Sequence, residues 1–376
     1  MSRWHRGWAI AATLLVAAIA FTAVFFASSE SSEDLSPPPR SFFGVVPQTA
    51  LYEDDLDRMG QGNVGMIRLH VAWALLDPTA ADDYAWEGID SVVLGAAERK
   101  IEVLPFLFAT PPWVAELDGH GDCDPDCAIY APRSQAALAA WAEFVSAAVK
   151  RYGPDGELWG ENPDVEPLPI RAWQIWNEQN SPTFYLPKPD VDAYADLLAT
   201  SEQAIHEHDF DAEVVLGGMF GTPLGGEPPA ITAGDYLREL YEAGAATSFD
   251  GIAVHPYAGR AVNIEEQVSS MRSEVVAADD DASTWVTEVG WASSGPPNPL
   301  TKGAKGQAAE LEAAYELLLE RRLEWDIETV SWYSWRDTAS DSSPCEWCGG
   351  SGLFPADSLD EPKPAWESFV SFTDGS

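Results

Sequence analysis

An eightfold alternation of strand-like and helix-like segments constrains this chain more than any other feature of its sequence. Short runs of β-branched and other apolar residues recur at 42–47, 64–71, 101–108, 169–176, 213–217, 251–256, 284–289 and 329–335. Each run precedes a helical segment, expected at 51–59, 86–99, 134–151, 190–207, 233–243, 263–277, 304–322 and after Pro364. This alternation indicates a parallel sheet of the α/β class, and eight units in about 330 residues predict a single (β/α)8 TIM barrel. An open doubly wound sheet is the alternative, although no Gly-rich phosphate loop follows any run.

The charge balance limits the partners of the chain. Its 376 residues include 61 acidic and 21 basic side chains, which gives a formal net charge of −40. This excludes nucleic acid, because a phosphate backbone is bound by clustered Lys and Arg. The 46% of apolar residues suffice for a large core, so the negative charge is interpreted as a means of solubility.

The first 40 residues indicate export. Arg3 and Arg6 precede an uncharged apolar run over 8–27, and a Ser/Glu/Pro-rich stretch follows. The run is longer than the roughly 7–15 residues of a signal-peptide core and close to the ~20 that span a bilayer. A cleaved signal peptide and an uncleaved membrane anchor therefore both stay open. Either places the remainder outside the cell, so the predicted protein is secreted or held on the outer side of the cell membrane.

These features divide the chain into three expected parts. Residues 1–29 form the signal peptide or anchor, 30–40 a Ser/Pro-rich linker, and 41–376 the barrel. Long insertions are expected in four loops that follow strands, where barrel enzymes keep their chemistry. They span 109–133, 177–189, 218–232 and 336–363.

The four cysteines form two close pairs, and each pair lies in one of these insertions. Cys123 is four residues from Cys127, and Cys345 is three residues from Cys348. An oxidising compartment favours disulfides, and local pairing is expected. A zinc site with four thiolates is the alternative.

Two of the expected strands end at a glutamate. The strand over 169–176 runs into Asn177 and Glu178, and the strand over 284–289 contains Glu288. Hydrolysis of a glycosidic bond needs two carboxyl groups that flank it, one protonated and one ionised. Strand ends meet at one mouth of a barrel, so these two glutamates are candidates for that pair. Burial and a nearby second carboxylate would keep one of them protonated, whereas a nearby cation would keep the other ionised.

The sequences around both glutamates resemble those of known glycosidases. Trp-Asn-Glu-Gln-Asn at 176–180 and Thr-Glu-Val-Gly-Trp at 287–291 are similar to the acid/base and nucleophile motifs of clan A retaining glycoside hydrolases, most of all family 39 and related (β/α)8 glycosidases. The resemblance covers roughly 41–370. It implies Glu178 as general acid/base, Glu288 as nucleophile and Asn177 as donor to the sugar 2-hydroxyl.

The chain departs from the family patterns at two places. Family 39 usually has Pro at the position of Gln179. The His of family 5 cellulases at the end of the third strand is replaced by Ala-Thr-Pro at 109–111, which disfavours a standard family 5 enzyme.

The resemblance also implies residues that bind substrate. Arg68, followed by His70 in Ile-Arg-Leu-His, resembles the clan arginine near the nucleophile. His255 and Tyr257 resemble the pair on the sixth strand. The complete expected set of substrate-binding residues is Arg68, His70, Asn177, His255, Tyr257, Trp291, Trp332 and Trp335.

Tryptophan is abundant, with 16 Trp against 15 Phe and 11 Tyr. Sugar rings stack on aromatic planes, so tryptophans near strand ends suit a carbohydrate cleft, although they could equally fill the barrel. Trp332 and Trp335 are rival candidates for the clan tryptophan of the eighth strand. The tryptophans near expected strand ends or in the last long loop are Trp73, Trp113, Trp176, Trp291, Trp335 and Trp347.

The sequence thus predicts a glycosidase that hydrolyses O-glycosyl bonds of a β-linked oligo- or polysaccharide with retention. The two carboxyl groups are expected about 5 to 5.5 Å apart. No metal or organic cofactor is needed for this reaction. A non-catalytic carbohydrate-binding barrel and a transglycosylase are the alternatives.

Overall fold

The computed structural model describes residues 37–80, 83–222, 230–338, 345 and 347–374. The expected signal peptide or anchor, with its apolar run over 8–27, and most of the linker lie outside these described residues. No helix within the described ranges is long and apolar enough to cross a membrane.

The described chain forms a closed parallel barrel. β1 pairs with both β2 and β9, and β5 pairs with both β4 and β7, which closes the sheet. The strands are β1 (Phe43–Val46), β2 (Met66–Ala72), β3 (Glu102–Phe108), β4 (Ala172–Ile175), β5 (Glu213–Leu216), β6 (Met219–Phe220), β7 (Gly251–His255), β8 (Ser283–Val289) and β9 (Ile327–Tyr333). The two-residue β6 also pairs with β7. β5 and β6 together therefore occupy one of the eight strand positions of the barrel. The predicted TIM barrel is confirmed.

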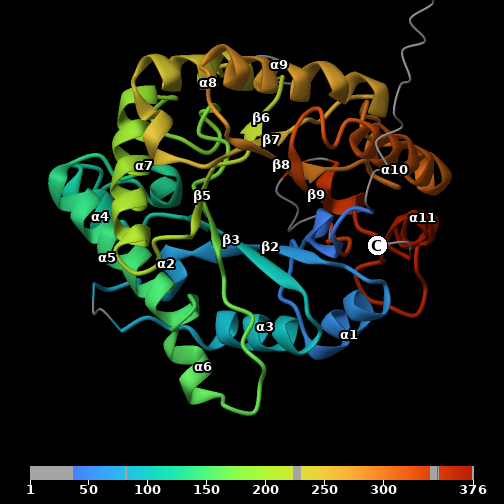
Figure 1. Ribbon diagram of the computed structural model, residues 1–376, viewed down its shortest axis with the longest axis horizontal. Coiled ribbons are helices and arrows are strands. Elements are labelled where there is room, and N and C mark those ends of the chain that lie inside the picture. Colours follow the sequence, from blue (N-terminus) through green and yellow to red (C-terminus); the bar gives the residue numbers. More distant parts are fainter. Residues whose placement is uncertain (1–36, 81–82, 223–229, 339–344, 346, 375–376) are drawn as a thin grey trace, which may run out of the picture. The chain divides into compact units, whose positions relative to one another are not determined.

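Helices surround the strands (Figure 1). All eight expected helices are present, and their ends agree with the expected ones to within about two residues, the usual scatter of helix boundaries. They are α1 (Glu53–Gln61), α3 (Glu87–Glu98), α5 (Gln135–Tyr152), α7 (Val191–His206), α8 (Ala233–Glu242), α9 (Ile264–Ala277), α10 (Gly303–Glu320) and α11 (Pro364–Thr373). Short helices α2 (Trp73–Leu76), α4 (Pro112–Leu117) and α6 (Glu157–Glu161) lie in the connections.

The inside of the barrel changes from apolar to polar along the strands. A separate apolar cluster consists of Met66, Leu104, Val215, Ala253 and Trp285. Successive side chains of a strand alternate between its two faces, so the next inward residues lie two positions further on. In four of the strands these residues are Arg68, Phe106, His255 and Thr287. The apolar cluster thus forms a floor beneath a polar layer nearer the mouth.

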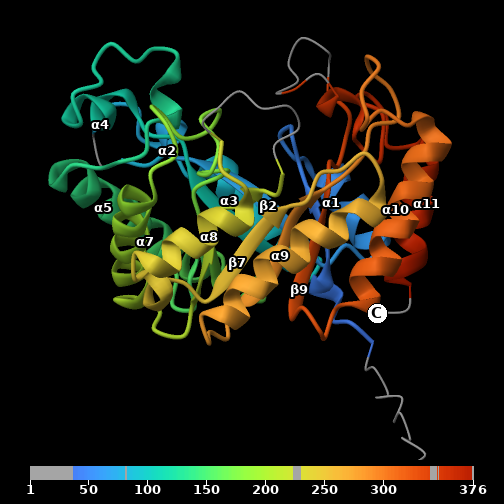
Figure 2. The same cartoon turned by 90° about the horizontal axis from the view of Figure 1, so that it is seen from above.

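Both cysteine pairs form local disulfides, as predicted, with Cys123 bonded to Cys127 and Cys345 to Cys348. This excludes the alternative of a zinc site with four thiolates. In Figure 2, α4 and its neighbouring loop stand on one side of the barrel, whereas the described chain begins on the other. The insertion over 109–133 therefore belongs to the mouth at the C-terminal ends of the strands.

Candidate active site

A fully buried arginine organises the polar layer. Arg68 donates from Nε to Gln174 Oε1 at 2.6 Å, from Nη1 to Glu288 Oε1 at 2.5 Å and from Nη2 to Asn177 Oδ1 at 2.8 Å. Its guanidinium also lies 4.0 Å from the ring centroid of Phe106. A buried charge is tolerated only when it is paired and hydrogen-bonded, and here three strands supply its partners. The guanidinium therefore fixes Glu288 and Asn177 relative to each other.

Glu288 accepts a second donor on its other oxygen. The Tyr257 hydroxyl donates to Glu288 Oε2 at 2.6 Å. Burial raises the pKa of the Glu288 carboxyl above its usual value, and the Arg68 charge and the hydrogen bonds from Tyr257 and Arg68 offset only part of this rise. These donors stabilise the ionised form of Glu288.

Glu178 has different surroundings. Its Oε1 lies 2.8 Å from His255 Nδ1. Burial, and secondly the negative charge of Glu288, raise the pKa of Glu178 well above its usual value. Burial and the nearby Arg68 lower the pKa of His255 well below its usual value, so the imidazole is neutral and supplies no charge to offset this effect. Of the two carboxyls, Glu178 is therefore the one that retains a proton.

The two glutamates converge. One carboxylate oxygen of each and one nitrogen of His255 all lie within 4.8 Å of one another. Glu178 is 7% exposed and Glu288 is 9% exposed, so each keeps a small solvent-accessible surface. The same three ligand atoms could hold a divalent cation, and the expectation that no metal is required stays a prediction.

The backbone around Glu178 is shaped by unusual conformations. Trp176 has a φ of 72° and Glu178 a φ of 46°, in the left-handed region that bulky residues rarely adopt. The Glu178 N–H donates to the Gly218 carbonyl at 3.0 Å. A Cβ at Gly218 would lie 2.0 Å from His255 Nε2, so only glycine fits there. The turn at the end of β4 and this glycine together aim Glu178 at His255.

Three of the expected substrate-binding tryptophans lie elsewhere. Trp291, Trp332 and Trp335 are fully buried, and their indole N–H groups donate to protein oxygens. A side chain without accessible surface offers no face for a sugar to stack on. The expectation that these three tryptophans contact substrate is therefore corrected: they pack inside the protein. The same burial applies to Trp73 and Trp176, whereas Trp113 is half-buried.

The residue of β9 that faces the carboxyls is Tyr333. Its ring centroid lies 6.2 Å from that of Tyr257, so the neighbouring Trp332 points to the opposite face of the strand. Burial and the charges of Glu288 and Glu178 raise the pKa of Tyr333 well above its usual value, which places its phenol near both. The sequence analysis sought a tryptophan on this strand and missed Tyr333. Strand alternation was the signal that could have found it.

His70 lies at the mouth, two residues beyond Arg68. Its ring stacks on Phe106 with centroids 4.7 Å apart and an interplanar angle of 7°. The imidazole is accessible to water but enclosed by protein on its other sides, and this burial, with the charge of Arg68, lowers its pKa to about 4. His70 thus presents a neutral imidazole at the mouth.

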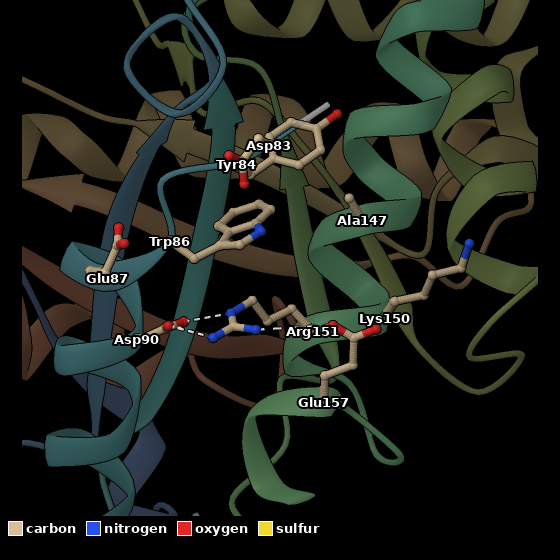
Figure 3. A pocket seen from close by; sticks show the side chains of 9 residues that line it. All are labelled: Asp83, Tyr84, Trp86, Glu87, Asp90, Ala147, Lys150, Arg151 and Glu157. Atoms are coloured by element: carbon tan, nitrogen blue, oxygen red, sulfur yellow. Dashed lines mark hydrogen bonds and ion pairs between the residues drawn. The ribbon is translucent and has the colours of Figure 1, made fainter. Parts of the chain in front are cut away.

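A hollow of about 470 Å³ lies between α3 and α5 (Figure 3). Asp90 and Arg151 point toward each other across it and form two hydrogen bonds of 2.7 and 2.5 Å. The Asp90 carboxylate is thus held in an ion pair with Arg151.

Comparisons with known proteins bear on the fold. No protein-family model and no curated protein matches the sequence. Solved glycoside hydrolases share the fold. A family 39 enzyme from the gut symbiont Bacteroides cellulosilyticus aligns with a TM-score of 0.64 and 20% identity, over 89% of this chain and 64% of its own. This chain thus spans less than two thirds of the length of that enzyme.

Two further structures show the same similarity. A family 39 β-xylosidase from Caulobacter crescentus aligns with a TM-score of 0.59 and 18% identity, over 90% of this chain and 72% of its own. A family 5, subfamily 18 enzyme from Streptomyces cattleya, solved with Manβ1-4GlcNAc, aligns with a TM-score of 0.60 and 17% identity, over 90% and 80%. The predicted similarity to clan A glycoside hydrolases is confirmed at the level of the fold.

Proposed function

We propose that this protein is a retaining glycoside hydrolase that cleaves a neutral, β-linked glycan. The observation that supports this most directly is the convergence of Glu178 and Glu288, whose nearest oxygens lie within 4.8 Å. Retaining enzymes hold their carboxyl groups about 5 to 5.5 Å apart, whereas inverting enzymes need about 6.5 to 9.5 Å to admit a water molecule. The short separation favours a nucleophile and an acid on opposite sides of one acetal.

The proposed reaction has two steps. In the first, Glu288 attacks the anomeric carbon while Glu178 protonates the departing glycosidic oxygen, so a glycosyl ester of Glu288 forms. In the second, Glu178 removes a proton from water, which attacks the anomeric carbon and releases Glu288. The donors on Glu288 suit its ionised role, and the raised pKa of Glu178 suits its role as acid.

Asn177 is proposed to bind the sugar hydroxyl next to the anomeric carbon. Arg68 donates to Asn177 Oδ1, which orients the amide and leaves its nitrogen as the group that can donate. This role follows from the family resemblance, and the geometry is compatible with it. His70 and Tyr333 are proposed as further contacts from the second and last barrel strands.

Release of a chromogenic aglycone from a panel of aryl β-glycosides tests the proposal. We expect turnover by the wild type on at least one member, and no turnover by Glu288→Ala. Glu178→Ala should keep activity only on glycosides whose leaving group needs no protonation. A wild type that binds sugars but hydrolyses none of the panel, and no polysaccharide, would instead support the carbohydrate-binding alternative. Products longer than the substrate would support the transglycosylase.

We also propose that the protein is exported, on the basis of the apolar run over 8–27. Disulfides in two loops suit an oxidising compartment. N-terminal sequencing of the protein recovered from cells would separate the two possibilities. A start near residue 29 indicates cleavage and secretion, whereas an intact start in the membrane fraction indicates an anchor.

A further inference from the structure

Trp347, in the last long loop, contacts Tyr257, and Tyr257 in turn is hydrogen-bonded to Glu288. The Trp347 ring meets the Tyr257 ring nearly edge to face, with centroids 4.9 Å apart and an angle of 68°. It meets the Tyr333 ring at 6.0 Å and 61°. Tyr257 is the residue whose hydroxyl donates to Glu288. Trp347 is only 9% exposed, so its main contacts are with protein.

The segment after Trp347 is fastened to the body of the barrel. The Cys348 carbonyl accepts from Gln48 Nε2 at 3.1 Å and from Ser351 Oγ at 2.7 Å. The Gly350 carbonyl accepts from the Ser293 N–H at 2.8 Å, close beyond the end of the strand that contains Glu288. These contacts fix the chain on the C-terminal side of Trp347.

The Cys345–Cys348 disulfide fixes the other side. It closes a loop of which Trp347 is a member, and the Cys348 N–H lies 3.2 Å from Cys345 Sγ. The bond limits how far Cys345, on the N-terminal side of Trp347, can move from Cys348. Trp347 is thus held against Tyr257 from both directions along the chain.

We propose that Trp347 is a positioning residue for Glu288, seated by the Cys345–Cys348 disulfide: it packs on Tyr257 and so keeps the Tyr257 hydroxyl on Glu288 Oε2. This inference rests on the proposed role of Glu288 as nucleophile. The disulfide loop is then part of the active site, and the oxidising compartment becomes a condition for full activity.

The expected consequence concerns the acid limb of the pH profile. The Tyr257 hydroxyl stabilises the carboxylate form of Glu288, so a displaced hydroxyl raises the pKa of Glu288. The limb in which activity rises with pH should then move to higher pH. Because a hydrogen bond to a charged group is only partly lost, we expect kcat/KM on the acid limb to fall by about three- to tenfold.

The test compares Trp347→Ala, Trp347→Phe and the double variant Cys345→Ser/Cys348→Ser with the wild type. Tyr257→Phe sets the size of the full effect. The matched control is Cys123→Ser/Cys127→Ser, which removes the other local disulfide. Thermal unfolding checks that each variant folds. kcat/KM is measured against pH, and the Glu288 carboxyl is titrated by 13C NMR with Glu288→Gln to assign its signal.

The proposal is supported if Trp347→Ala and the Cys345/Cys348 variant shift both the acid limb and the NMR titration upward. Trp347→Phe should return both most of the way to their wild-type positions, and the Cys123/Cys127 variant should shift neither. A higher KM with both titrations unmoved would overturn the proposal, because Trp347 would then only contact sugar. The NMR titration needs no substrate. If the wild type hydrolyses no glycoside, an NMR shift still supports the positioning role and its absence still contradicts it.

Discussion

Carboxylates cluster at both ends of the barrel, but the groups that surround them differ. At the mouth, Glu178 and Glu288 lie among Arg68, His255 and Tyr257, which bond to individual oxygens. At the other end, where the strands begin, burial and secondly the charges of neighbouring carboxylates raise the pKa values of Glu102, Glu213 and Glu328. Asp250 and Asp326 contribute negative charge to this group.

The difference lies in what surrounds each carboxylate. The strand-start glutamates are accessible to water, and burial, reinforced by neighbouring negative charges, raises the pKa of Glu213. At the mouth, burial acts on both glutamates, while a fixed cation and a phenol act mainly on Glu288. A cluster of acidic residues alone therefore does not indicate an active site. Hydrogen-bond donors that bind one carboxylate and not its neighbour do indicate one.

The largest expected contrast is between Glu288→Gln and Glu213→Gln. Loss of a nucleophile typically lowers kcat by a factor of about 10⁴ or more. We expect this loss at Glu288 and activity within about twofold of wild type at Glu213, since no reacting group lies at the strand starts. Steady-state kinetics on the best aryl glycoside measures both. Equal losses in the two variants would contradict the comparison.

Removal of the buried cation should destabilise the protein. Arg68→Gln leaves Glu288 and Asn177 without their shared donor, and breaking a buried ion pair costs about 3–5 kcal/mol. Arg133→Gln breaks a partly exposed pair with Asp190, for which about 0–1 kcal/mol is expected. Urea denaturation of both variants gives the two free energies of unfolding. Similar losses in the two variants would show that the buried Arg68 contributes no more to stability than the partly exposed Arg133.

A single methyl group should disturb the mouth. Gly218→Ala places a Cβ against His255, so we expect about 1–3 kcal/mol of destabilisation and a displaced Glu178. Gly160→Ala, in α6 with open space around it, is the matched control and should be neutral or slightly stabilising. Thermal unfolding and kcat together distinguish the two. An unchanged kcat in Gly218→Ala would sink the argument that this glycine aims the acid.

The smallest effect is expected at the strand starts. The pKa of Glu213 is raised on folding, so the native state binds more protons, and stability falls as pH rises through that raised pKa. Glu213→Gln should therefore stabilise the protein by less than about 1 kcal/mol at pH 8, because the carboxyl is solvent-accessible. The gain should vanish at pH 4. Free energies of unfolding at both pH values provide the check, and a gain independent of pH would mean that charge is not its cause.

Regular structure was predictable from the sequence, and the reasons are visible in particular residues. Ser134 accepts a hydrogen bond from the Ala137 N–H and starts α5 where the sequence predicted. β6 was missed because two residues are too few to show a strand pattern. Glu178 and Glu288 were located because each lies near the C-terminal end of an expected strand. Their ionisation depends on contacts from other strands, such as Arg68 to Glu288, which are separated by 220 positions.

The aromatic residues show where sequence reasoning stops. The abundance of tryptophan suggested a sugar-binding rim, yet Trp291, Trp332 and Trp335 are buried. Abundance does not say which face of a strand a residue occupies, whereas alternation does. The contact of Trp347 with Tyr257 depends on an irregular loop without periodicity. Only three-dimensional structure reveals such a contact.

Proton NMR of the anomeric centre during hydrolysis tests the central claim most directly. If Glu288 forms a glycosyl ester, the sugar first released from a β-glycoside must be the β-anomer, and the α-anomer must appear only later by mutarotation. Initial release of the α-anomer would mean a single displacement by water and would contradict the roles assigned to Glu178 and Glu288.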